Sequence, residues 1–161
     1  MLNRKLENFT AYAFADNAEQ GNPAGVVLLN EWLSQEIMQK IATENNLPET
    51  AFIFPRDNNL NEWDIRWFTP IMEVPLCGHA TLASAAVLHQ IYRYSPPSFK
   101  FYAKRDFLEV KLMKSKYLLD LPSDIPVKSK LSSEVIEALG LNDGCVYKGR
   151  DYYLVKLSDE T

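Results

Sequence analysis

The chain has 161 residues, of which 47% are hydrophobic and 24% are charged, a balance typical of a globular protein with a core of ordinary size. The formal net charge is −4, and the lysines and arginines are scattered, which argues against a nucleic-acid-binding surface. The longest apolar-leaning run, residues 78–88, is too short to span a membrane. No secretory signal pattern occurs at the start, so we expect a cytoplasmic protein with no membrane partner.

Alternating apolar residues and turn signals predict more strands than helices. In chain order, we predict strands at 8–14 and 25–29, a helix at 34–45, strands at 51–55 and 63–67, a helix at 79–91, strands at 99–103, 108–112 and 117–121, a short helix at 133–139, and strands at 145–148 and 152–157. Ser34 is the predicted N-cap of the first helix. The proline-containing stretch at 122–126 is interpreted as a loop, so residues 1–161 are predicted to form one domain.

The predicted helix at 79–91 consists almost wholly of small residues and follows a glycine, Gly78. Small side chains let strands pack closely around a helix, which predicts a buried central helix inside a curled mixed sheet, an α+β fold. The first turn of a helix leaves backbone N–H groups free to bind an anion, and glycine lets a ligand approach the backbone. We therefore expect a carboxylate-binding site at Gly78 and His79.

The residues that commonly bind metals are few in this sequence. The two cysteines, Cys77 and Cys145, have a spacing that indicates neither a disulfide framework nor a metal knuckle. The two histidines, His79 and His89, are too few for a zinc site made only of protein ligands. The sequence therefore predicts no metal.

Five ordered segments resemble the successive blocks of the phenazine-biosynthesis (PhzF-like) isomerase family. They are Gly21-Asn22-Pro23-Ala24-Gly25-Val26-Val27, Met38–Ala42, Glu49–Phe52, Arg66–Pro70 and Glu73–Ala83. The resemblance covers essentially the whole chain but only the N-terminal half of the family. It implies one half of the two-domain diaminopimelate-epimerase fold, in which the active site lies between two sheets that each curl round a helix. The Asp-Pro-Val-Thr-Gly-Ser-Ala motif usual in the second half does not occur in this sequence.

The resemblance implies that Glu49 is the general base and acid of an isomerase, moving a proton between carbons of a small carboxylate-bearing substrate without a cofactor. It further implies that Gly78, His79 and Asn22 bind the substrate, with Ala80 as a possible contributor. Other interpretations stay open: Glu49 as a solvated residue just after a helix, His79 as a cap for neighbouring backbone, and Asn22 as a turn residue that satisfies its own backbone.

Two other functions remain open. Related racemases of this fold use a pair of cysteines as opposed bases, and Cys77 at a helix N-terminus would then need Cys145 as its partner; as a structural alternative, Cys77 is a small buried residue. A catalytically silent binding domain is the alternative from another class. Because the second half is missing, we expect either a two-fold homodimer or a separately encoded C-terminal half as partner.

Overall fold

The computed structural model describes residues 6–16, 20–56, 60–114, 116–141 and 144–157. The chain divides into two compact units, Met1–Pro122 and Ser123–Thr161. This division differs from the single domain over 1–161 that the sequence predicts. It falls at the start of the stretch 122–126, which the sequence predicts to be a loop. The residues beyond this stretch pair among themselves in a separate sheet.

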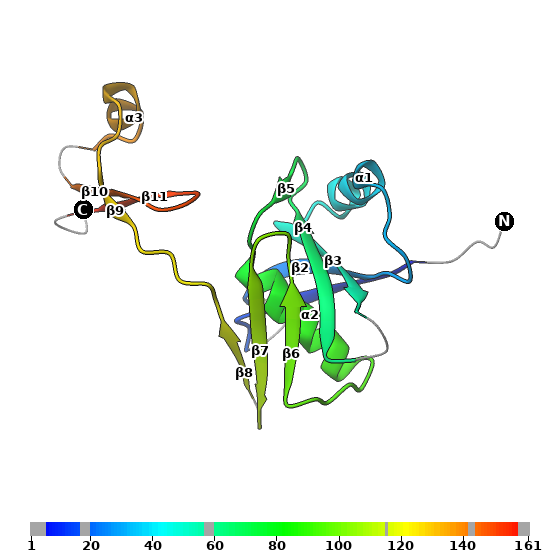
Figure 1. The fold of residues 1–161 in the computed structure, drawn as a ribbon. Helices are drawn as coiled ribbons and strands as arrows, with labels where there is room; N and C mark the ends of the chain where they lie inside the picture. The colour runs from blue at the N-terminus through cyan, green and yellow to red at the C-terminus, as the bar shows by residue number, and fades with distance from the viewer. Residues whose placement is uncertain (1–5, 17–19, 57–59, 115, 142–143, 158–161) are drawn as a thin grey trace. The chain divides into compact units, whose positions relative to one another are not determined.

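The first unit is an eight-stranded mixed sheet with two helices (Figure 1). Its elements are β1 (Glu7–Ala13), β2 (Asn22–Leu28), α1 (Gln35–Asn45), β3 (Glu49–Pro55), β4 (Glu62–Phe68), β5 (Glu73–Val74), α2 (Gly78–Gln90), β6 (Ser98–Tyr102), β7 (Phe107–Met113) and β8 (Lys116–Asp120). The strand order is β1-β2-β3-β4-β6-β7-β8, with β5 paired to β4. The pairs β2–β3 and β4–β6 are parallel, and the other pairs are antiparallel.

The sheet curls round α2, as the sequence predicts. The helix contacts β1 and β2 toward one end of the sheet and β7 and β8 at the other end, which a flat sheet would not allow. Three alanines of α2, Ala80, Ala83 and Ala85, are buried among the strands, and so are Thr81 and Ser84. The Thr81 and Ser84 hydroxyls donate to the carbonyls of Cys77 and Ala80, four residues earlier. These bonds satisfy polar groups that would otherwise destabilise a buried helix.

Strand alternation builds a separate core on each face of the sheet. On the α2 face, Val26, Ala51 and Trp67 belong to the larger core. On the other face, the adjacent residues Val27, Phe52 and Phe68 pack with Met38 and Ala42 of α1 in a smaller core. Because successive side chains of a strand point to opposite faces, central strands buried on both sides are continuously apolar. This explains the unbroken apolar runs in β2 and β3.

Most predicted elements are present, with their ends displaced by a few residues. Ser34 is the N-cap of α1, and its hydroxyl accepts from the Ile37 N–H. The strand predicted at 25–29 begins earlier, at Asn22, so Asn22 and Pro23 belong to β2 and not only to a turn. The two-residue strand β5 and the three-residue strand β9 (Val127–Ser129) were not predicted. Among the described residues, no helix combines the length and apolarity needed to cross a membrane.

The second unit is a small antiparallel sheet with one short helix. It contains β9, α3 (Ser133–Ala138), β10 (Cys145–Lys148) and β11 (Tyr153–Lys156), in the strand order β11-β10-β9. The short helix begins after its N-cap Ser132, whose hydroxyl accepts from the Val135 N–H. None of its described residues is buried. This unit therefore contributes no core of its own, whereas every buried side chain described lies in the first unit.

Removal of residues 123–161 is expected to leave the first unit folded. Burial of apolar side chains is the dominant stabilising term in folding, and the described core lies within Met1–Pro122. We expect the far-ultraviolet circular dichroism per residue and the melting temperature of the shortened chain to stay close to those of the full chain. A shortened chain that does not melt cooperatively would contradict this prediction.

Candidate functional site

Glu49 is the first residue of β3 and lies beside the parallel strand β2, where its register partner is Ala24. Since α1 ends at Asn45, Glu49 is a strand residue and not a solvated residue following a helix. Its side chain is 22% exposed. The packing of α2 against β3 brings the first turn of the helix to this carboxylate.

His79 lies between Glu49 and Cys77. Its Nε2 is 3.2 Å from Glu49 Oε2, and its Nδ1 is 3.4 Å from Cys77 Sγ. The histidine side chain is 11% exposed. Although Nε2 is within ion-pair distance of the carboxylate, the pair is not aligned as a hydrogen bond, so this buried nitrogen has no hydrogen-bond partner. The structure thus brings together Glu49 and His79, the base and the substrate-binding residue that the family resemblance implies for one site.

Cys77 is the N-cap residue of α2, and its side chain is buried. Burial raises the pKa of the Cys77 thiol to about 12, because the thiolate would lose its hydration, while the nearby backbone N–H groups of Ala80 and His79 act in the opposite direction. The thiol is therefore protonated at neutral pH. This environment is that of a small buried residue, and it does not activate the sulfur as a base.

Gly78 begins α2, and the N-cap side chain makes no capping hydrogen bond. A Cβ at position 78 would lie 3.4 Å from Leu119 Cδ2 and 3.8 Å from a Leu121 methyl, which are ordinary contacts. The fold itself therefore does not require glycine here. Ala80 is completely buried, so only its backbone could reach a ligand.

Asn22 begins β2, two residues before the Ala24 that pairs with Glu49. Because the starts of parallel strands meet at the same edge of a sheet, Asn22 and Glu49 lie toward the same edge. Asn22 is partly exposed. Its place in the fold is compatible with ligand binding and does not by itself assign that role.

A partly buried polar pair lies next to Glu49, and the sequence analysis did not identify it. Thr50 is completely buried next to Glu49, and Asn45 Nδ2 donates to its hydroxyl at 3.0 Å. Gly25 of β2 leaves the room for this pair, since a Cβ there would lie 2.7 Å from Thr50 Oγ1 and 2.8 Å from Asn45 Nδ2. The glycine thus permits a contact that fixes the start of β3.

The variant Gly25→Ala is expected to lower the free energy of unfolding by roughly 1–3 kcal/mol, because the added methyl group displaces Thr50 or Asn45. The matched variant Gly78→Ala meets only ordinary contacts and should change stability little. Urea unfolding of both variants measures the difference. Equal losses in the two variants would show that close packing at Gly25 is not the cause.

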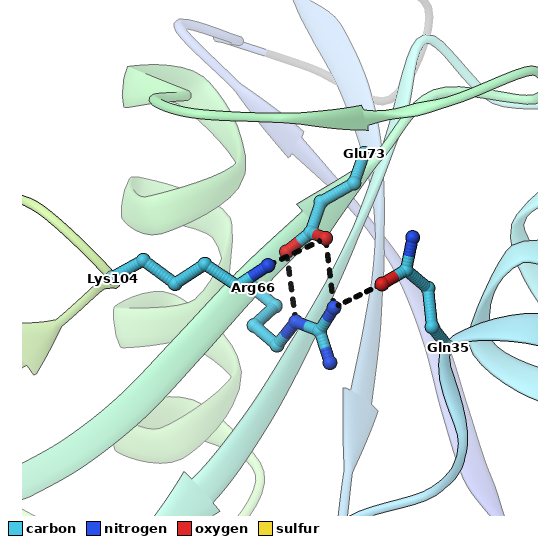
Figure 2. A network of polar contacts seen from close by, with 4 residues as sticks. All are labelled: Gln35, Arg66, Glu73 and Lys104. Atoms are coloured by element: carbon cyan, nitrogen blue, oxygen red, sulfur yellow. Dashed lines mark hydrogen bonds and ion pairs between the residues drawn. The ribbon is translucent and has the colours of Figure 1, made fainter.

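A second group of polar residues holds β5, the strand that leads into the Gly78 turn (Figure 2). Arg66 of β4 donates from Nε and Nη2 to the two carboxylate oxygens of Glu73, at 2.8 Å and 2.7 Å. Lys104 donates to the same carboxylate at 3.0 Å, and Gln35 accepts from Arg66 Nη2 at 3.2 Å. Glu73 is therefore a structural ion-pair residue of a strand.

This ion pair predicts a pH-dependent contribution to stability. The Arg66 hydrogen bonds, with a smaller contribution from Lys104, lower the pKa of Glu73 below its ordinary 4.5 in the folded state. A lowered folded-state pKa means that the pair stabilises fully above pH 4.5 and loses its contribution as the pH falls further. We expect Arg66→Met to cost roughly 1–3 kcal/mol at pH 7 and less at pH 3, as measured by urea unfolding. A cost independent of pH would contradict the assignment.

The sequence matches a known protein family and several curated relatives. The PhzC-PhzF profile, described as "Phenazine biosynthesis-like protein", matches residues 11–132. An uncharacterised isomerase of Pseudomonas aeruginosa is 42% identical over 156 residues, which cover 97% of this chain and 59% of that protein. The phenazine biosynthesis-like domain-containing protein of Homo sapiens is 40% identical over 166 residues, with 96% and 58% covered. The chain therefore spans less than two thirds of the length of these relatives.

Solved structures agree with the fold. A PhzF-family protein of Enterococcus faecalis matches with a TM-score of 0.77 and 39% identity, covering 96% of this chain and 58% of that chain. A Pseudomonas aeruginosa protein described as a "Predicted Epimerase" matches with a TM-score of 0.70 at 19% identity, covering 89% and 55%. The second likeness shows the fold alone. Together they confirm the predicted α+β fold, a curled mixed sheet of the epimerase-like type.

Proposed function

Because this chain belongs to the PhzC-PhzF phenazine-biosynthesis-like family, we propose that it is an isomerase that moves a proton between two carbons of a small carboxylate-bearing metabolite. The observation that carries the proposal is the 3.2 Å approach of Glu49 Oε2 to His79 Nε2 beside the first turn of α2. One carboxylate and one imidazole next to a helix N-terminus can together bind an acid and transfer its proton.

In this proposal the first turn of α2 binds the substrate carboxylate. The backbone N–H groups after Gly78 are not capped by the N-cap side chain, and they lie at the positive end of the helix dipole. Since the fold leaves room for a Cβ at position 78, a close approach of ligand to the backbone gives a reason for glycine there. Asn22, toward the same edge of the sheet, is proposed as a further contact.

Glu49 is proposed to accept a proton from one carbon of the substrate and to return it to another. The electron pair of the broken C–H bond delocalises toward the substrate's unsaturated system, and the bound His79 ring stabilises the charge that develops there. The proton returns from Glu49 to the new carbon, so protons and electrons balance and the reaction requires no redox cofactor.

We further propose a cytoplasmic location, because both cysteines are free thiols.

A cysteine-based racemase is supported less well by the site. Such an enzyme needs a thiolate near neutral pH, whereas burial raises the pKa of Cys77 to about 12. The partner that this mechanism requires, Cys145, is exposed and belongs to the second compact unit. Glu49 is therefore the preferred base.

The test is hydrogen exchange in heavy water. The chain is incubated with a panel of cyclic and amino-substituted carboxylic acids, alone and with any separately encoded second half, and deuterium uptake at carbon is followed by mass spectrometry. Uptake into one acid supports the isomerase. No uptake under any of these conditions would support the alternative, a silent binding domain, and binding at Gly78 would then still shift the backbone amide signals of residues 78–81 on titration with benzoate-like acids.

We also propose that two copies associate with two-fold symmetry. The second unit exposes several large apolar side chains that a second copy would cover; they include Ile125, Val127, Leu139, Tyr152 and Leu154. The family's two pseudo-symmetric halves suggest that a second copy can take the place of the other half. Sedimentation of the chain at tens of micromolar should show a dimer, and a monomer alone would overturn this proposal.

A further inference from the structure

The three side chains at the N-terminus of α2 carry three different metal-binding atoms. Glu49 offers a carboxylate oxygen, His79 an imidazole nitrogen and Cys77 a sulfur, and these atoms lie within 4.8 Å of one another. Two of the three residues are two positions apart, and the third comes from β3. Counting cysteines and histidines along the sequence could not find this group, because its third member is a carboxylate brought in by the fold.

With one ligand atom from each residue, the three atoms lie up to 4.8 Å apart, somewhat farther than around a bound metal. In tetrahedral zinc coordination, with metal–ligand distances of about 2.0–2.3 Å, neighbouring ligand atoms lie roughly 3.3–3.6 Å apart. The Cys77 Sγ to His79 Nδ1 distance is 3.4 Å, and the His79 Nε2 to Glu49 Oε2 distance is 3.2 Å. A metal would use one imidazole nitrogen, so the ligand on the opposite side of the ring must move toward it. Because the ligand atoms already lie within 4.8 Å of one another, coordination requires a side-chain movement of only about 1 Å.

We propose that Glu49, His79 and Cys77 bind a zinc ion, and that zinc at this position inhibits the protein. The combination of one sulfur, one nitrogen and one oxygen suits Zn²⁺, whereas Mg²⁺ and Ca²⁺ prefer oxygen ligands alone. The Cys77 thiol loses its proton to solvent when the metal binds. Three protein ligands leave the fourth position for water or for the carboxylate of a ligand.

The inhibitory consequence follows from the identity of the residues, and this part of the inference rests on the proposed function. A carboxylate that coordinates zinc cannot accept a proton from carbon, so zinc binding removes the proposed general base. His79, once coordinated, is also unavailable to the substrate. Metal binding itself, however, is measured without any substrate, so its failure and the failure of the proposed isomerase activity are separate results.

The test uses Co²⁺ as a spectroscopic substitute for Zn²⁺ on the full chain. Binding at this site should produce a thiolate-to-cobalt charge-transfer band and intense visible bands of tetrahedral cobalt, which added Zn²⁺ then removes. Isothermal titration with Zn²⁺ gives the affinity. We expect Cys77→Ser to lose the charge-transfer band, and His79→Gln and Glu49→Gln each to weaken zinc binding by at least about tenfold.

Control variants separate this site from adventitious binding. Cys145→Ser removes the exposed thiol, and His89→Gln removes the histidine that contacts the Tyr117 hydroxyl at the other end of α2; both should bind cobalt as the unmodified chain does. If Cys77→Ser does not fold, His79→Gln decides instead. The proposal is overturned if the unmodified chain gives no charge-transfer band, or if the band is lost in Cys145→Ser and kept in Cys77→Ser.

Discussion

Glu49→Gln is expected to reduce carbon-bound hydrogen exchange by about 10²–10⁴, the usual contribution of a positioned general base. Glutamine keeps the shape of the side chain and removes the proton acceptor, so β3 should remain intact. His79→Gln is expected to lower the rate by about 10²–10³, because it removes one stabilising group from the developing charge. Deuterium uptake by mass spectrometry measures both effects on whichever acid the unmodified chain exchanges.

Two control variants test whether the loss of exchange is specific to Glu49. Glu44→Gln changes an exposed carboxylate of α1 that pairs with Lys40 at 3.9 Å, and it should leave the rate unchanged. Cys77→Ser should also leave most of the rate, since the buried thiol is protonated at neutral pH. If Cys77→Ser abolished exchange while Glu49→Gln did not, the cysteine would be the base and our assignment would be wrong.

The sequence predicts a helix or strand correctly wherever its apolar residues repeat over enough positions to show a period. Alternation in β7, where Leu108 and Val110 are buried and Lys111 is exposed, was readable from the residues alone. The small residues of α2 likewise indicated a helix enclosed by strands. By contrast, β5 and β9 are too short to show a period. The start of β2 was predicted too late because Pro23 lies there, and proline favours turns and the ends of strands.

The candidate site shows the limits of reading single residues. A helix N-terminus suggested an activated Cys77, since the helix dipole favours a thiolate by about 0.3–1 kcal/mol. Burial raises the thiol pKa from 9.0 to about 12, which corresponds to roughly 4 kcal/mol in the opposite direction. Burial therefore wins, and burial of position 77 depends on strands that lie far away in the sequence. The same holds for Glu73, whose partners Arg66 and Lys104 meet it only in the folded sheet.

Trp67→Ala is expected to cost about 3–5 kcal/mol of the free energy of unfolding, the largest effect on stability that we predict. Trp67 is 1% exposed and lies between its register partners Ala51 of β3 and Val74 of β5. Its loss would open a cavity between the strand that begins with Glu49 and the strand that leads to Gly78. Urea unfolding followed by circular dichroism measures the change without relying on tryptophan fluorescence.

The variant Trp67→Phe should cost much less than Trp67→Ala, for two reasons. Phenylalanine fills most of the same space, and it removes an indole Nε1 that is buried without a hydrogen-bond partner, a donor whose burial costs about 1–3 kcal/mol. Trp32→Ala provides the matched control, because that indole is 38% exposed and its removal should cost about 1 kcal/mol or less. If Trp67→Phe cost as much as Trp67→Ala, the Trp67 N–H would have to donate to an ordered water, and the core beside the site would be wetter than its burial indicates.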